Sequence, residues 1–152
     1  MSRRIALASD HAAFAMKAEL ANWLREAGHE VLDLGTNGPE SVDYPDYGFA
    51  LGKAIEDGRA DTGVALCGSG IGISIAVNRE PACRCALVSE PLSAALSRQH
   101  NDANVIALGA RLIGEDMAKA CISAFLAAEY EGGRHDQRVA KLSHPNLVKE
   151  SV

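Results

Sequence analysis

Short apolar runs alternate along this chain with longer segments in which apolar residues recur every three or four positions. The first run covers 4–9. In 12–27 the apolar positions share one face of a helix, and Gly28 stands where a helix-ending glycine is expected. The same alternation predicts further elements along the chain: strands over 30–34, 62–67, 84–88 and 104–108, and helices over 47–57, 71–78, 92–100 and 115–128.

The strands are continuous apolar runs, which is typical of a parallel sheet with helices on both faces. We therefore predict an α/β fold: a doubly wound, Rossmann-like sandwich with a five-stranded parallel sheet in the order 2-1-3-4-5. In that order the first and third strands flank the point where such sheets bind ligands. A chain of 152 residues fits one domain over 1–152, and the polar tail over 131–152 is expected to contain one more helix.

Composition narrows the class of protein. The formal net charge of -5 argues against a nucleic-acid partner, because binding to a phosphate backbone needs concentrated positive charge. Neither a signal peptide nor a membrane span is apparent, so we expect a cytoplasmic protein with no membrane partner. The chain has four cysteines, which show neither metal-ligand spacing nor a disulfide framework: Cys67, Cys83, Cys85 and Cys121. We therefore expect reduced thiols and no bound metal.

The segment over 64–74 carries the most specific functional signal. An apolar run reaches Cys67, and Gly68, Gly70 and Gly72 then alternate with other residues before a helical segment. A glycine-rich turn at the carboxyl end of a parallel strand lets backbone N–H groups approach an anion. A helix N-terminus also favours a thiolate, so Cys67 is a candidate base or nucleophile. A thiol packed as a small hydrophobe is the alternative interpretation.

Two polar residues follow the first strand, which the predicted order places beside Cys67. Asp10 and His11 stand in the turn Ser9-Asp10-His11. Alone, Asp10 would cap a helix and His11 would lie on the surface. Two titratable groups that converge on a thiol favour a functional site instead.

Other candidates lie in the second half of the chain, and each has a structural alternative. His100 and Asn101 close a helix, where a histidine is favourable and an asparagine serves as a cap. Arg134 and Arg138 are four residues apart, so in a helix both guanidinium groups would face one way and suit a phosphate; a solvated charged face has the same spacing. Arg111, after the fifth strand, is equally ambiguous.

The glycine pattern argues against three other phosphate sites. Its spacing is not Gly-x-Gly-x-x-Gly, and the turn after the first strand has no glycine, which disfavours a dinucleotide. A cysteine phosphatase loop needs an arginine six residues after the cysteine, where this chain has Ile73. No lysine follows the glycines as a Walker loop requires.

Together these motifs resemble those of the ribose-5-phosphate isomerase B family of sugar-phosphate isomerases, over nearly the whole chain. They stand in the same order as in that family: Ser9-Asp10-His11, Asp43-Tyr44-Pro45, Cys67 to Ser74, Ser89-Glu90-Pro91, Leu96 to Asp102, Glu129 to His135, and Arg138. Several independent motifs in the right order make the resemblance specific.

The resemblance implies isomerisation of a phosphorylated aldose to a ketose through a cis-enediolate, without metal or other cofactor. Cys67 would move a proton between C1 and C2. Some relatives use a glutamate after the glycine loop instead, but Ser74 stands in the matching region here, which favours Cys67. The Ser69 hydroxyl and backbone N–H groups of the turn would stabilise the oxyanion, with substrate contacts from Gly68, Ser69, Gly70, Ile71 and Gly72.

The resemblance also assigns the other candidates. His100, helped by Asp10, would open the furanose ring. The phosphate would be held by His11, Arg134 and Arg138, and the sugar by Asn101 and Arg111.

A homodimer with a shared site is implied as well, with a tetramer as the alternative. A fifth strand at the sheet edge would lie two strands from Cys67, so we expect His100, Asn101 and Arg111 to reach the pocket of a partner. The tail over 131–152 is expected to contribute to the phosphate site and the dimer.

The sugar's length stays open at this point. A five-carbon sugar phosphate is the leading hypothesis, and allose, galactose and tetrose phosphates are alternatives. A second class of function is a non-catalytic, flavodoxin-like module that binds a phosphorylated ligand. Such a module would bind the sugar without exchanging its protons with solvent.

Overall fold

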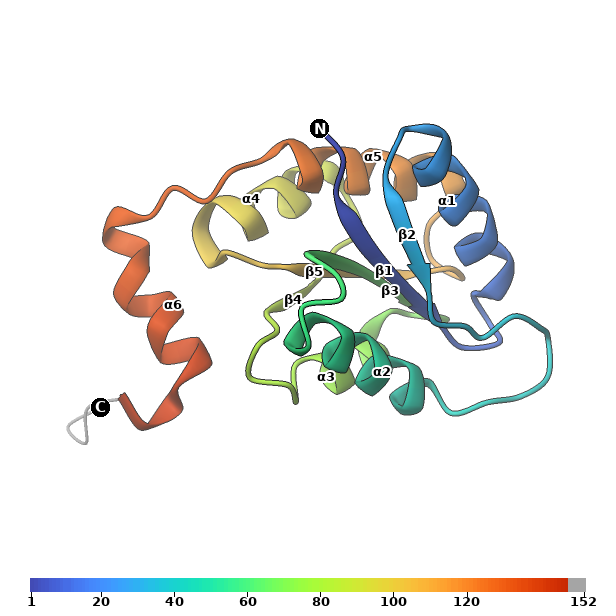
Figure 1. The fold of residues 1–152 in the computed structure, drawn as a ribbon, viewed down its shortest axis with the longest axis horizontal. Helices are drawn as coiled ribbons and strands as arrows, with labels where there is room; N and C mark the ends of the chain where they lie inside the picture. Colours follow the sequence, from blue (N-terminus) through green and yellow to red (C-terminus); the bar gives the residue numbers. More distant parts are fainter. Residues whose placement is uncertain (148–152) are drawn as a thin grey trace.

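A computed structural model describes residues 1–147, and a parallel sheet runs through its centre (Figure 1). The sheet strands of this part are β1 (Arg4–Ser9), β2 (Glu30–Asp33), β3 (Thr62–Cys67), β4 (Cys85–Leu87) and β5 (Val105–Gly109). The helices are α1 (Phe14–Glu26), α2 (Tyr44–Glu56), α3 (Ile71–Val77), α4 (Pro91–Asn101), α5 (Glu115–Ala127) and α6 (Asp136–Ser143), with 3-10 turns η1 (Gly133–His135) and η2 (Pro145–Leu147). The predicted α/β class and its parallel strands are confirmed.

The strand order is β2-β1-β3-β5-β4, so the predicted order was wrong in its last two places. β5 pairs directly with β3, and Cys67 lies opposite Gly109 in the register. Burial explains the exchange. Every residue of β5 is buried, as an interior strand requires, whereas none of the three residues of β4 is. The shorter, partly exposed strand therefore takes the edge.

Two helical layers cover the sheet. α1, α4 and α5 lie on one face, and α2 and α3 lie on the other (Figure 1). Alternate side chains of β1 enter separate apolar cores: Ile5 and Leu7 contribute to one, Ala6 and Ala8 to the other. Burial on both faces accounts for the continuous apolar runs in the sequence.

Two helices near the site begin at residues other than those expected. α1 begins at Phe14, after a turn in which Asp10 Oδ1 accepts the Ala12 N–H at 3.0 Å. α2 begins at Tyr44, inside the stretch interpreted as a loop. Pro45 fits the first turn of α2, because a position at a helix N-terminus needs no N–H donor.

After α5 the chain forms a C-terminal arm (residues 128–147), and its α6 extends away from the sheet (Figure 1). The helix expected in the tail is confirmed as α6, and the tail's last residues, 148–152, lie outside the described part of the chain. None of the eight residues of α6 is buried. Within residues 1–147, no helix has the length and apolar character to cross a membrane.

Candidate active site

Cys67 is the last residue of β3 and lies at the carboxyl edge of the sheet. Its side chain is buried, and the Gly70 N–H donates a hydrogen bond to Cys67 Sγ at 3.2 Å. Such a bond is stronger when the sulfur is a thiolate, because a charged acceptor attracts the N–H more strongly. The turn after β3 therefore holds Cys67 in an environment that suits a base.

The turn needs glycine for two separate reasons. Gly70 has a φ of +77°, a left-handed conformation that strains any side chain. Space is also restricted, since a Cβ on Gly70 would lie 2.9 Å from the carbonyl carbon of Leu108 in β5. The loop after β3 thus packs directly on the main chain of its neighbouring strand.

A cavity of about 530 Å³ opens over Cys67 and this turn. The volume falls in the range of small-molecule sites. The cavity combines a carboxylate, a thiol, a hydroxyl and a guanidinium group with apolar walls, and its lining is Asp10, Tyr44, Cys67, Gly68, Ser69, Ile71, Gly72, Ile75, Arg111 and Leu112. Most of the turn residues expected to contact substrate are therefore gathered at one place.

Asp10 and His11 follow β1, which pairs with β3 as predicted. Asp10 is buried and lines the Cys67 cavity. His11 is not among the lining residues. Its Nδ1 accepts the Val42 N–H at 3.1 Å, a contact that holds the loop before α2.

Arg111 lies in the Cys67 cavity of its own chain, contrary to the expectation that it reaches a partner's pocket. The backbone N–H of Arg111 donates to the Gly68 carbonyl at 3.0 Å. Its side chain lies close by, since a Cβ on Gly68 would be 3.1 Å from Arg111 Nη1. The physical reason is the strand order. Because β5 pairs with β3, the residue that follows β5 stands beside the turn that follows β3.

His100 and Asn101 are far from Cys67 in the same chain. They end α4, which returns from the carboxyl edge of the sheet to the amino end of β5. Cys67 pairs with Gly109 at the other end of β5, four residues beyond Val105 or about 13 Å along the strand. Within one chain, the structure therefore does not bring the predicted ring-opening group to the predicted base.

His100 belongs instead to a cluster with two residues of the C-terminal arm. Its ring stacks on that of His135, with centroids 4.6 Å apart and planes 14° from parallel. With Glu131, these side chains place three metal-ligating atoms within 4.8 Å of one another. A metal lies in the plane of each imidazole that binds it, and near-parallel stacked rings share no such point. As arranged, the cluster is therefore a stacked pair rather than a metal centre.

The two arginines of the phosphate hypothesis also lie on the C-terminal arm. Arg134 is in η1 and Arg138 is in α6, and both are exposed. The arm leads away from the sheet (Figure 1), and neither arginine lines the Cys67 cavity. As with His100, their predicted role requires a Cys67 site other than that of their own chain.

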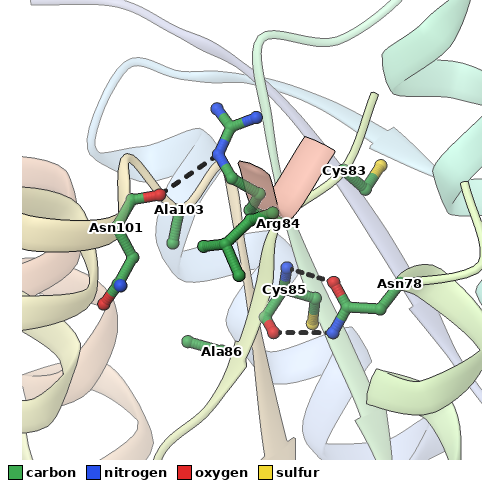
Figure 2. A pocket seen from close by; sticks show the side chains of 8 residues that line it. Asn78, Cys83, Arg84, Cys85, Ala86, Asn101 and Ala103 are labelled. Carbon is green, nitrogen blue, oxygen red and sulfur yellow. Dashed lines mark hydrogen bonds between the residues drawn. The ribbon is translucent and has the colours of Figure 1, made fainter. Parts of the chain in front are cut away.

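A second cavity, of about 420 Å³, lies beside the end of α4 (Figure 2). Arg84 spans it: Nε donates to the Asn101 carbonyl at 3.1 Å, and Nη1 donates to Ser143 Oγ at 3.1 Å, which connects the arm to α4. Burial raises the pKa of the Cys83 thiol here to about 12, and burial likewise raises that of Cys85. Neither of these thiols suits proton transfer near neutral pH.

Tyr44 is a cavity residue that the sequence interpretation left without a role. Its ring packs against Gly72, where a Cβ would lie 2.5 Å from the ring. The third glycine of the turn is therefore a space requirement. The sequence shows a glycine at position 72, but it does not show which residue fills the space beside it. Tyr44 is 28 positions earlier in the chain, and only the fold brings the two together.

Comparison with known proteins agrees with this geometry. A family model described as Ribose/Galactose Isomerase matches residues 5–142. Ribose-5-phosphate isomerase B of Escherichia coli is 47% identical over 141 residues, 93% of this chain and 95% of its own length. D-erythrulose-4-phosphate isomerase of Pectobacterium atrosepticum is 40% identical over 141 residues, 92% of this chain and 93% of its own.

Solved structures give the same result. Ribose-5-phosphate isomerase B of Clostridium thermocellum has a TM-score of 0.92 at 45% identity and covers 94% of this chain and 97% of its own. The type B ribose 5-phosphate isomerase of Trypanosoma brucei has a TM-score of 0.91 at 40% identity, covering 95% and 99%. The chain belongs to the ribose/galactose isomerase family, and it is a sugar-phosphate isomerase of the aldose-ketose type.

Proposed function

We propose that this chain interconverts ribose 5-phosphate and ribulose 5-phosphate through a cis-enediolate. One observation carries the proposal: Cys67 lines a cavity, and the glycine turn after it donates a backbone N–H to the Cys67 sulfur. The relatives named for ribose 5-phosphate support this choice of substrate.

The Cys67 thiolate removes the proton on C2 of the open aldose. The O2 hydroxyl proton passes to O1 within the enediolate, and Cys67 returns its proton to C1, which leaves the carbonyl at C2. A proton next to a carbonyl is too weakly acidic to be removed unless the developing oxyanion is stabilised at the same time. The Ser69 hydroxyl and the backbone N–H groups of the turn supply that stabilisation, and one preorganised donor is worth about 3 kcal/mol. The Ile71 N–H donates to Ser69 Oγ at 3.2 Å, a contact that a substrate oxygen would replace.

Ring opening comes before this proton transfer. The C1–O4 bond breaks with its electron pair going to O4, the O1 hydroxyl loses a proton, and O4 gains one. His100 serves as the acid-base group of this step, and Asp10, buried in the cavity, assists it.

Phosphate binding fixes the sugar at its other end. His11, Arg134 and Arg138 supply the donors, with Asn101 and Arg111 on the sugar. A remote anchor of this kind raises the rate by fixing the reacting carbons beside the base.

The site is shared between two copies of the chain in this proposal. His100, Asn101, Arg134 and Arg138 lie away from their own Cys67, so a partner must supply them to each cavity. Side chains around that cavity support a docked partner, because Ile71, Ile75 and Leu112 are each at least half exposed. A two-fold dimer satisfies both cavities at once, and two such dimers would form a tetramer. We place the enzyme in the cytoplasm, where its thiols stay reduced.

A four-carbon substrate is the second candidate, favoured by the 40% identity to D-erythrulose-4-phosphate isomerase. The test is to incubate the protein in D₂O with ribose, erythrose, allose and galactose phosphates and follow ketose formation and deuterium uptake. We expect the highest kcat/KM for ribose 5-phosphate. Turnover of only another sugar phosphate would overturn the substrate, and binding without deuterium uptake would overturn the chemistry.

A further inference from the structure

His135 is buried, although it lies on an arm that is otherwise largely exposed. Only 6% of the residue is accessible, and its ring covers one face of the His100 ring at a centroid distance of 4.6 Å. A stacked neighbour restricts rotation of an imidazole about its own side-chain bonds. The position of His100 therefore depends on a residue 35 positions later in the chain.

Glu131 contacts the same two rings from their edge. Its Oε1 is 3.7 Å from His100 Nε2 and 3.6 Å from His135 Nε2. Its backbone N–H donates to the Gln99 carbonyl at 3.0 Å. Main chain and side chain together attach Glu131 at the end of α4, next to His100.

His135 Nε2 is buried without a hydrogen-bond partner among residues 1–147. A buried polar group left unpaired is costly, and structures keep one mainly where it serves another role. If residue 135 only packed against His100, a leucine or phenylalanine would fill the same space without burying an unpaired nitrogen. The nitrogen beside a carboxylate thus indicates more than packing.

We propose that Glu131 and His135 are positioning residues for His100 in ring opening. The inference rests on the proposed function, because it assumes that His100 transfers protons to and from the sugar. His135 fixes the plane of the His100 ring. Glu131, near both Nε2 atoms, stabilises the imidazolium that forms each time His100 takes a proton from O1.

The same contacts join ring opening to phosphate binding. His135 directly follows Arg134 in η1, and Arg138 follows within α6. Because His135 stacks on His100, the spacing between the phosphate anchor and the acid-base group is set by this stack. Loss of the stack should therefore displace His100 relative to the bound sugar, while Arg134 and Arg138 still hold the phosphate.

The test compares three variants with an exposed control on the same arm. His135→Ala removes the stacked ring, His135→Phe keeps a flat ring without nitrogen, and Glu131→Gln keeps the shape without the charge. Gln137→Ala, exposed in α6, is the control. Two rates are measured for each: turnover of saturating ribose 5-phosphate, which requires ring opening, and exchange of the C1 hydrogen of ribulose 5-phosphate with D₂O, which does not.

We expect His135→Ala and Glu131→Gln to lower ribose 5-phosphate turnover about tenfold, a smaller loss than removal of the acid-base group itself. C1 exchange should stay within about twofold of the unmodified protein, and His135→Phe should recover part of the loss from His135→Ala. Equal losses of turnover and exchange, or no loss in any variant, would overturn the positioning role. If His135→Ala does not fold, Glu131→Gln at an exposed carboxylate and His135→Phe still decide it.

A second measurement separates this inference from the proposed function. Nitrogen-15 spectra of the His100 ring report its tautomer and its contact with Glu131 without any substrate. If the unmodified protein does not turn over ribose 5-phosphate, the proposed function fails. If Glu131→Gln leaves the His100 ring signals unchanged, the positioning inference fails whatever the activity.

Discussion

Gly109 leaves room for the main chain of Ser69: a Cβ on Gly109 would lie 2.6 Å from the Ser69 carbonyl oxygen. The two residues belong to neighbouring strands and turns, since Gly109 is the register partner of Cys67. The position of the turn after β3 therefore depends on the absence of a side chain at Gly109 in β5. A substitution at Gly109, which does not line the Cys67 cavity, should therefore alter activity by moving the turn.

Replacing Gly109 with alanine should displace the turn by a substantial fraction of an ångström. We expect kcat to fall roughly 10²-fold, because small misplacements of reacting groups cost about that much, and the free energy of unfolding to fall by about 1–3 kcal/mol. Gly114→Ala is the matched control, since a Cβ there meets nothing within 4 Å. Steady-state kinetics and urea unfolding measure the two effects. Near-normal turnover of Gly109→Ala would contradict the close contact between strand and turn.

Cys67→Ala should abolish isomerisation while sugar phosphate still binds, because the base is lost and the phosphate anchor remains. Iodoacetamide near pH 8 should inactivate the protein by modifying Cys67, with protection by substrate. Cys83, Cys85 and Cys121 should react slowly, because burial raises the pKa of each thiol and leaves little thiolate at that pH. Mass spectrometry of the alkylated peptides identifies the site. Substantial turnover by Cys67→Ala would assign proton transfer to another residue.

Removal of His100 should affect the cyclic substrate most. We expect His100→Ala to lower turnover of saturating ribose 5-phosphate by roughly 10² to 10⁴-fold, the range for a positioned acid-base group. Exchange of the C1 hydrogen of ribulose 5-phosphate, which cannot form a furanose, should persist. Loss of both rates to the same extent would give His100 a structural role or a place in the proton transfer itself.

Chelators should leave activity unchanged, because the mechanism assigns ring opening to His100, the C2-to-C1 proton transfer to Cys67 and stabilisation of the oxyanion to protein donors. Dialysis against EDTA followed by the ribose 5-phosphate assay tests this directly. Activity that disappears in EDTA and returns with a divalent cation would contradict this mechanism.

How far the sequence alone predicts this molecule depends on the range of each signal. Local patterns identified the strands, the glycine turn and the last helix, because apolar periodicity and turn chemistry act over a few residues. The exchange of β4 and β5 was missed, because the predicted strands over 84–88 and 104–108 have the same length and are equally apolar in sequence. Only the structure shows that β4 is short and partly exposed. That one error reversed the expectation for Arg111, which stands beside Gly68 in its own chain.

Longer-range relationships were beyond sequence reasoning. The stack of His135 on His100 joins two motifs that were noted separately, and only the path of the C-terminal arm brings them together. The separation of His100 from Cys67 was expected, but for the wrong reason. It follows from the direction of α4, which carries His100 to the amino end of β5, and not from an edge position of β5.

The shared site is the central claim, and mixing two inactive variants tests it most directly. Cys67→Ala keeps an intact His100, and His100→Ala keeps an intact Cys67, so a mixed dimer would contain one complete site. After subunit exchange, verified by native mass spectrometry of differently labelled chains, ribose 5-phosphate turnover should return to as much as one working site per mixed dimer. Exchange without any return of activity would contradict the shared site and require Cys67 and His100 to act within one chain.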